Sequence, residues 1–172
     1  MKRVGAYFGK MKGNGQAPER PPLREVLWSW FGSGAGIGAV TMVSMLSKLP
    51  LLVAPLGATC VLIFAAADSP LAQPRSVLGG YLISAVIGVL ALTVVGPAPW
   101  VIALSVATAI AVMQLTRTLH APAGAVPLLA FSAGTDPALL IPTVMAGAAT
   151  LIGIGLLVHN LRHDRAYPRY WI

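Results

Sequence analysis

Long apolar stretches, separated by short polar or Pro/Gly-rich breaks, run along most of this chain and predict membrane-spanning helices. Four of the stretches are continuous: 27–47, 77–95, 99–115 and 138–159. About 20 helical residues cross ~30 Å of hydrocarbon, because each residue adds about 1.5 Å. We therefore expect an all-α membrane protein with a single transmembrane domain over residues 27–160.

Two further apolar segments are shorter and contain helix-disfavouring residues. Leu51–Ala67 holds Ala-Pro-Leu-Gly-Ala at 54–58, and Leu119–Ala133 holds Ala-Pro-Ala-Gly-Ala at 121–125. Proline lacks an amide proton and clashes with the preceding turn, so a continuous helix is not expected in either segment. Each segment either crosses the membrane as a broken helix or enters and returns as a re-entrant half-helix.

The two broken segments belong to a duplication with an offset of 67 residues. When 54–91 is aligned with 121–158, thirteen of 38 positions are identical. Matched prolines and glycines mark shared backbone geometry, so we expect two three-element repeats, about 27–95 and 99–160. The identical pairs are Ala54/Ala121, Pro55/Pro122, Gly57/Gly124, Ala58/Ala125, Leu62/Leu129, Phe64/Phe131, Ala66/Ala133, Pro70/Pro137, Val77/Val144, Gly80/Gly147, Ile87/Ile154, Gly88/Gly155 and Leu90/Leu157.

The basic residues between the spans distinguish two topologies. If both broken segments cross, there are six membrane segments, the repeats are inverted, and Arg75 and Arg117 face the cytoplasm while Lys48 lies outside. If both are re-entrant, there are four full spans and all three basic residues lie outside. The positive-inside rule favours six segments, and four spans with two re-entrant half-helices is the alternative.

Composition and charge agree with a membrane location. The chain is 56% hydrophobic and 10% charged, and of its twelve Lys and Arg residues six precede residue 27 and three follow residue 160. We expect a basic cytoplasmic arm at 1–26 and a basic cytoplasmic tail at 161–172, in a bacterial cytoplasmic (inner) membrane. The net charge of +7 then reflects topology, and no nucleic-acid partner is expected.

The two breaks are the candidate binding site. Helix-start amides near Gly57 and Gly124 would lack intrahelical acceptors, and such amides bind anions when they line a cavity near the midplane. The alternative is that these residues only permit tight helix crossing. The candidate substrate-binding residues are Pro55, Gly57, Ala58, Thr59, His120, Pro122, Gly124, Ala125, Arg75 and Arg117.

The ionisable candidates each have more than one interpretation. His120 precedes a midmembrane break, where it would donate to an anion, shuttle a proton or cap backbone carbonyls. Arg75 and Arg117 border loops and are either anion contacts or interfacial anchors. Asp68 and Asp136 adjoin Pro70 and Pro137 and are interpreted first as turn residues.

Several motifs resemble the HPP family of small integral membrane proteins. They are Pro-Leu-Gly-Ala-Thr at 55–59, Ser-Pro-Leu-Ala-Gln-Pro-Arg at 69–75, Gly79-Gly80, and His-Ala-Pro-Ala-Gly-Ala at 120–125. The signature His-Pro-Pro is His120-Ala121-Pro122 here, so its middle position differs. The resemblance covers about 25–160 and implies a family usually described with four spans. Members in plastids and cyanobacteria are associated with nitrite transport.

The leading hypothesis is a transporter or channel for a small monovalent anion, most simply nitrite. The alternative is a non-transporting scaffold or assembly subunit, and an enzyme is not expected. We expect no cofactor and no metal ion, with the lipid bilayer and a small anion as partners. The small-residue face Gly32–Gly38 allows another helix to approach closely. It serves either packing within the chain or contact with a second copy in a homodimer.

Overall fold

The computed structural model describes residues 7, 9–11, 15–132 and 134–171. From residue 15 onward the regular structure of the described residues is entirely helical. Of the expected basic arm at 1–26, positions 1–6, 8 and 12–14 lie outside the described residues. The α-helices are α2 (Leu23–Ser47), α3 (Ala54–Ala65), α4 (Pro74–Leu90), α5 (Pro99–Leu115), α6 (Val126–Ala130) and α7 (Pro137–Asn160).

Three short helical turns lie next to the α-helices. The 3-10 turn η1 (Pro70–Ala72) precedes α4, and the 3-10 turn η3 (Ala121–Ala125) leads into α6. A π-helical turn, η2 (Ala91–Val95), extends α4. Among the described residues, α2, α4 with η2, and α7 are long and apolar enough to cross a membrane. Helix α5 has 17 residues, or about 26 Å, close to the lower limit for crossing.

Prolines mark the beginnings of most helices. Helices α3, α4, α5 and α7 each carry a proline in the first turn. At that position the missing amide would have no helical partner, and the fixed φ of proline suits the helix. Helices α2 and α4 begin a few residues before the expected 27 and 77, because their first turns are polar and hydropathy alone does not detect them.

The first broken segment differs from the expectation. Pro55 and Gly57 lie inside the first turn of α3, and the non-helical stretch is 48–53. The amide of Leu56 already donates to the carbonyl of Val53 at 3.0 Å. Proline is tolerated in a first turn, so Pro55 begins the helix and does not interrupt it. The prediction of free helix-start amides from about Gly57 onward is therefore wrong, because these amides lie inside the helix.

The second broken segment is closer to the expectation. Pro122 and Gly124 lie in the 3-10 turn η3, and the α-helical part that follows, α6, has only five residues. The proline pair thus has equivalent positions, each in the first turn of a short helical element. The break itself lies just before each proline in the sequence.

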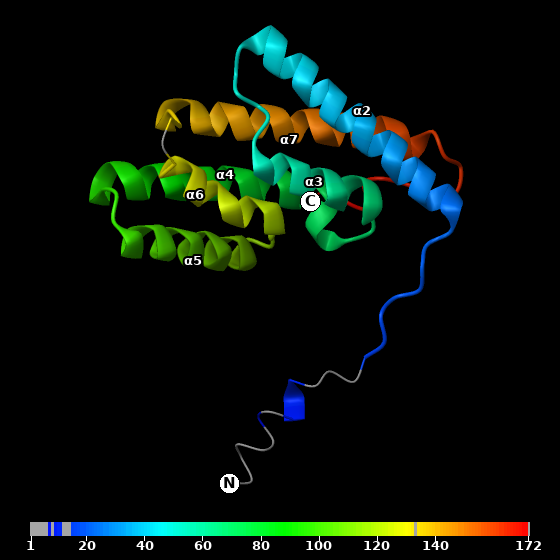
Figure 1. Ribbon diagram of the computed structural model, residues 1–172, viewed down its shortest axis with the longest axis horizontal. Helices are drawn as coiled ribbons and strands as arrows, with labels where there is room; N and C mark the ends of the chain where they lie inside the picture. The colour runs from blue at the N-terminus through cyan, green and yellow to red at the C-terminus, as the bar shows by residue number, and fades with distance from the viewer. Residues whose placement is uncertain (1–6, 8, 12–14, 133, 172) are drawn as a thin grey trace.

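The bundle is built around α4 and α7, which pack against each other and run in opposite directions (Figure 1). Helix α2 crosses α7, and α5 lies along α4. The short elements α3 and η3–α6 begin beside each other near the middle of the bundle and run apart toward opposite ends (Figure 1). The two Pro-containing segments of the candidate site therefore lie beside each other.

Glycines allow the short elements to pack closely on the long helices. A Cβ added to Gly88 of α4 would lie 2.8 Å from Cα of Pro127 and 3.3 Å from Cβ of Ala130 in α6. A Cβ added to Gly155 of α7 would lie 2.7 Å from Cγ2 of Ile63 in α3. Real Cβ atoms do not approach so closely, so these crossings require glycine.

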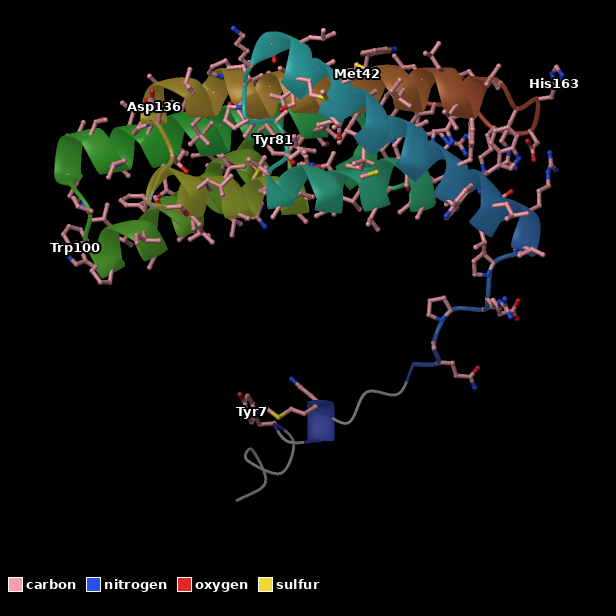
Figure 2. All side chains as sticks on the ribbon, turned by 45° about the horizontal axis from the view of Figure 1, so that its top comes forward. Tyr7, Met42, Tyr81, Trp100, Asp136 and His163 are labelled. Atoms are coloured by element: carbon pink, nitrogen blue, oxygen red, sulfur yellow. The ribbon has the colours of Figure 1, made fainter. Side chains whose placement is uncertain are left out.

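The two ends of the bundle differ in polarity. Asp136 and Trp100 lie at one end and His163 at the other (Figure 2). The ion pairs found among the described residues all lie near the His163 end, which holds the start of α2, the turn after α3 and the segment after α7. We call this the charged end.

Candidate functional site

Three buried side chains form a hydrogen-bonded chain inside the bundle. The hydroxyl of Thr59 lies 2.7 Å from the hydroxyl of Tyr81 and 2.7 Å from Nε2 of His120. Nδ1 of His120 lies 2.7 Å from the carbonyl oxygen of Leu71. The side chains of Thr59, Tyr81 and His120 are all fully buried. Figure 2 shows Tyr81 enclosed between the helices.

The acceptor at one end sets the direction of this chain. A carbonyl can only accept, so Nδ1 of His120 donates to Leu71. In the neutral imidazole Nε2 is then an acceptor, and Thr59 donates to it. The Thr59 oxygen in turn accepts from Tyr81, so each polar group in the chain has a partner. This arrangement satisfies the rule that buried polar groups are hydrogen-bonded.

Three different elements contribute to this hydrogen-bonded chain. Thr59 comes from α3, Tyr81 from α4, and His120 stands immediately before η3. Gly80 lets His120 approach, because a Cβ there would lie 2.7 Å from Cβ of His120. The site therefore lies where α3 and η3 meet on the surface of α4.

The ten predicted site residues divide into three groups, of which the two arginines are the last. Thr59 and His120 are in direct contact, and the prolines at 55 and 122 are buried beside them in the two short elements. The small residues are not part of this contact: Gly57 and Ala58 are exposed on α3, and Gly124 and Ala125 are half-buried. A Cβ on Gly57 or Gly124 would meet no atom of the described residues within 4 Å.

The two predicted arginines lie at the surface near one another. Nη2 of Arg75, in the first turn of α4, donates to the carbonyl of Thr116 at 3.1 Å, while its Nε is buried without a partner among the described residues. Arg117 is exposed and has a positive φ of 56° at the turn after α5. The structure thus places both arginines around the loop that leads to His120.

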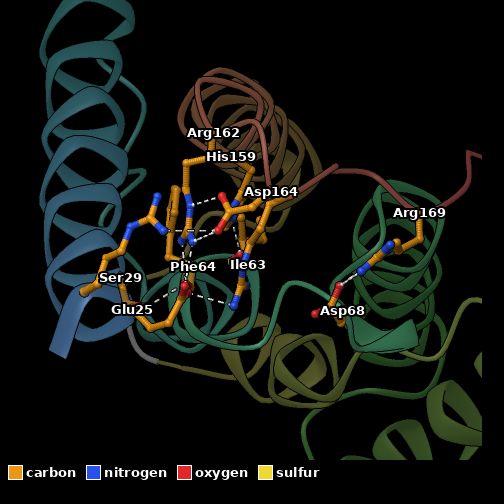
Figure 3. Close-up of polar contacts among 11 residues, drawn as sticks. Glu25, Ser29, Ile63, Phe64, Asp68, His159, Arg162, Asp164 and Arg169 are labelled. Atoms are coloured by element: carbon orange, nitrogen blue, oxygen red, sulfur yellow. Dashed lines mark hydrogen bonds and ion pairs between the residues drawn. The ribbon is translucent and has the colours of Figure 1, made fainter. Parts of the chain in front are cut away.

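A cluster of ion pairs closes the charged end (Figure 3). The guanidinium of Arg162, with 2% of its side chain exposed, contacts Glu25 at 2.6 Å and Asp164 at 2.8 Å, and lies 5.6 Å from the ring centroid of Trp28. Arg165 also contacts Glu25, at 2.7 Å. The hydrogen bond from Arg162 lowers the pKa of Asp164 to about 2.

The segment after α7 is joined to the turn that precedes α4. Tyr167 donates to the carbonyl of Ala72 at 2.8 Å, and Arg169 pairs with Asp68 at 2.6 Å. The amide of Arg169 donates to the side-chain oxygen of Gln73 at 2.8 Å. Asp68 is thus a turn residue, as predicted, with an ion pair that the sequence did not indicate.

Two members of the site were missed from the sequence. Tyr81 was not singled out, although a tyrosine inside an apolar span needs a hydrogen-bond partner and was a usable signal. The carbonyl of Leu71 carried no signal, because only the folded turn brings it to His120.

Asp136 caps α7, where its carboxylate accepts from the amide of Ala138 at 2.9 Å.

The family of the chain follows from comparison with known proteins. The family model described as HPP, transmembrane region, matches residues 18–168. The chain belongs to this family. Together with the three long apolar helices, the match makes this HPP chain an integral membrane protein.

Two transmembrane proteins of Dictyostelium discoideum are similar to this HPP chain. One is 34% identical over 178 aligned positions and the other 32% identical over 181, each alignment covering 96% of the chain. The chain spans 57% and 63% of the length of these two relatives. No solved structure matches the chain.

Proposed function

We propose that this HPP chain is a membrane transporter or channel for a small monovalent anion, most simply nitrite. The anion would bind near the midplane, where α3 and η3 meet beside His120. The observation that carries the proposal is the buried chain Tyr81–Thr59–His120, because an ionisable group deep in a membrane protein is costly and usually functional. The same proposal makes the protein a non-enzyme without a cofactor.

The packing supports a pair of inverted repeats. Gly88 and Gly155, which are 67 residues apart, pack on Ala130 and Ile63, which are also 67 residues apart. Each repeat thus places its short element on the long helix of the other repeat. In Figure 1 the equivalent pairs α3 and α6, and α4 and α7, run in opposite directions. Transporters with inverted repeats bind their substrates at the repeat interface.

The positions of the loops support six membrane segments. Arg75 contacts the loop at Thr116, and Asp68 pairs with Arg169 in the tail. The turn after α3 and the loop after α5 therefore lie at the same end as the C-terminal segment. That arrangement fits both termini in the cytoplasm of a bacterial cell with Arg75 and Arg117 on the cytoplasmic side.

The site is closed in this conformation. Thr59, Tyr81 and His120 have no exposed side-chain surface, so an anion reaches them only after the short elements move relative to the long helices. Alternating access by movement of one repeat against the other would supply such an opening. Protonation of His120 would then give the site a positive charge and a second ring donor for the anion.

The scaffold alternative also has an observation in its favour. Both ring nitrogens of His120 already have protein partners, and Gly80, Gly88 and Gly155 serve close packing. A purely structural His120 would have the same contacts. Transport measurements separate the two functions.

A homodimer through the small-residue face Gly32–Gly38 would use only two of its four glycines. Gly32 and Gly36 pack on Phe64 within the chain, because a Cβ on either would lie within 2.7 Å of that ring. A Cβ added to Gly34 or Gly38 would meet no atom of the described residues within 4 Å, so these two glycines are the part of the face open to another subunit.

Flux into liposomes tests the proposed function. Nitrite uptake into liposomes that contain the purified protein should exceed uptake into empty liposomes, and it should rise as pH falls, because protonation of His120 adds a positive charge to the site. His120→Ala should reduce uptake by roughly tenfold or more and flatten the pH response. His163→Ala, which changes an exposed histidine of the tail, should leave both unchanged. Flux equal to that of empty liposomes between about pH 5 and 8, for nitrite and other small anions, would favour the scaffold.

A further inference from the structure

A cavity of about 180 Å³ lies at the end of the bundle opposite the charged end. It lies between the connection from α2 to α3, the end of α6, the loop between α6 and α7, and the first two turns of α7, and it is partly open to the surface. It does not include any residue of the His120 site. The lining residues are Pro50, Val53, Leu129, Gly134, Thr135, Asp136, Leu139, Leu140 and Thr143.

Thr143, on the wall of this cavity, differs from four other threonines at or near helices. The hydroxyls of Thr41, Thr93, Thr116 and Thr150 each donate to the carbonyl four residues earlier. Thr143 is 3% exposed, yet its Oγ1 has no partner among the described residues. A buried unpaired hydroxyl is costly, so its retention in the cavity wall indicates a ligand or ligand-bound water.

The other polar side-chain atoms of the cavity are oxygens too. Asp136 uses one carboxylate oxygen to cap α7, and its second oxygen has no hydrogen-bond partner among the described residues. The hydroxyl of Thr135 also has none within that part of the chain. None of the described residues lining the cavity is a lysine, arginine or histidine, so its charge comes from one carboxylate. Oxygen ligands with a single negative charge select a cation and repel an anion.

We propose that this cavity binds a partly hydrated monovalent cation through Asp136, Thr135 and Thr143. Seven residues, or about 10 Å along the helix, separate Asp136 from Thr143, so one bare ion does not reach both. The volume holds an ion with several of its waters, and those waters connect the rim to the buried hydroxyl. A divalent ion is a poorer fit, because such ions usually recruit more oxygen ligands and charge.

This inference is separate from the proposed function. Cation binding is measured without any flux, so an inactive protein in the nitrite assay does not contradict it, and an absent cation site does not contradict anion transport. If both hold, the cavity supplies a site for a cation that accompanies the anion.

Thermal unfolding of the purified full chain in detergent tests the site. The melting temperature should rise saturably with NaCl or KCl and not with N-methyl-D-glucamine chloride at the same total chloride concentration, because a ligand of the folded state stabilises it by mass action. Thr143→Val and Asp136→Asn should each weaken the apparent cation affinity by at least about tenfold. Asparagine keeps the helix cap, so the Asp136 variant removes the charge and retains the fold.

Thr150→Val is the matched control, because its hydroxyl bonds within the same helix to Ala146. It should respond to cations as the unchanged protein does. Should Thr143→Val fail to fold, Thr135→Val replaces it. Equal melting temperatures in sodium, potassium and N-methyl-D-glucamine chlorides would overturn the site, as would an unchanged cation response in both the threonine and the Asp136 variants.

Discussion

Thr59 is the middle member of the buried hydrogen-bonded chain, and its hydroxyl serves two neighbours at once. It donates to His120 and accepts from Tyr81. A residue in that position matters more than one at the end, because its removal leaves two buried groups unpaired. Each unpaired buried group costs about 1–3 kcal/mol.

The residue-scale prediction compares the middle and the end of the chain. Thr59→Val should lower the free energy of unfolding by about 2–4 kcal/mol, because it leaves the Tyr81 hydroxyl and Nε2 of His120 unpaired. Tyr81→Phe should cost about 1 kcal/mol, because Thr59 keeps its bond to His120. Unfolding of the purified protein in detergent measures both. A larger effect for Tyr81→Phe would contradict the assigned hydrogen-bond directions.

At the scale of elements, glycines determine where the short helices lie on the long ones. Gly88 of α4 lies against the backbone of Pro127, and backbone cannot move aside as a flexible side chain does. A Cβ added to Gly153 of α7 would meet no atom of the described residues within 4 Å. Substitution of Gly88 therefore tests close packing, whereas substitution of Gly153 tests helix propensity alone.

The element-scale prediction uses this contrast. Gly88→Ala should destabilise the protein by about 1–3 kcal/mol, since the added carbon forces α6 away from α4. Gly153→Ala should stabilise it by about 0.5–1 kcal/mol, because alanine favours the helix. The melting temperatures of the two variants, compared with that of the unchanged protein, show whether each change stabilises or destabilises the fold. Destabilisation by both changes would mean that α7 has a packing constraint at Gly153 that the structure does not show.

At the scale of the whole molecule, the charged end joins the start of α2 to the segment after α7. Arg162 connects Glu25 and Asp164, and the hydrogen bonds to these two carboxylates raise the pKa of its guanidinium. The lowered pKa of Asp164 means that its charged form is favoured in the folded state. Its contribution to stability is therefore complete above its ordinary pKa of 3.8 and is lost as pH falls toward about 2.

The lowered pKa of Asp164 leads to a prediction about acid unfolding. Between about pH 4 and pH 2, part of the acid-induced loss of stability should come from Asp164. Asp164→Asn should lower stability at neutral pH and reduce the dependence on pH in that window. Acid unfolding followed by tryptophan fluorescence, with Trp28 beside Arg162, measures the change. An unchanged acid profile in the variant would show that the pair contributes nothing measurable, as many exposed pairs do.

The topology prediction also concerns the whole molecule. A cysteine at position 117, in a Cys60→Ser background, should be labelled from the cytoplasmic side, because the six-segment arrangement places this loop with the termini. Impermeant thiol reagents applied to cells and to inverted vesicles distinguish the sides. Labelling of position 117 from the outside only would favour four spans with two re-entrant half-helices.

The sequence by itself determined the helical membrane class, the approximate segments and the family. Hydropathy over about 20 residues reports on membrane insertion, which is a local property of the chain. The pairing of Thr59 with His120 was partly accessible too, because both residues adjoin the duplicated prolines. Helix beginnings at Leu23 and Pro74 were missed, because polar first turns do not register as apolar.

Only the tertiary structure decided which side chains meet. The start of α3 at Ala54 depends on whether Pro55 begins or breaks a helix, and the sequence allows both. The outward direction of Gly57, the contact of Leu71 with His120 and the unpaired hydroxyl of Thr143 all depend on how distant segments pack. Such contacts are set by three-dimensional packing across long separations in the chain, which local patterns of hydropathy do not encode.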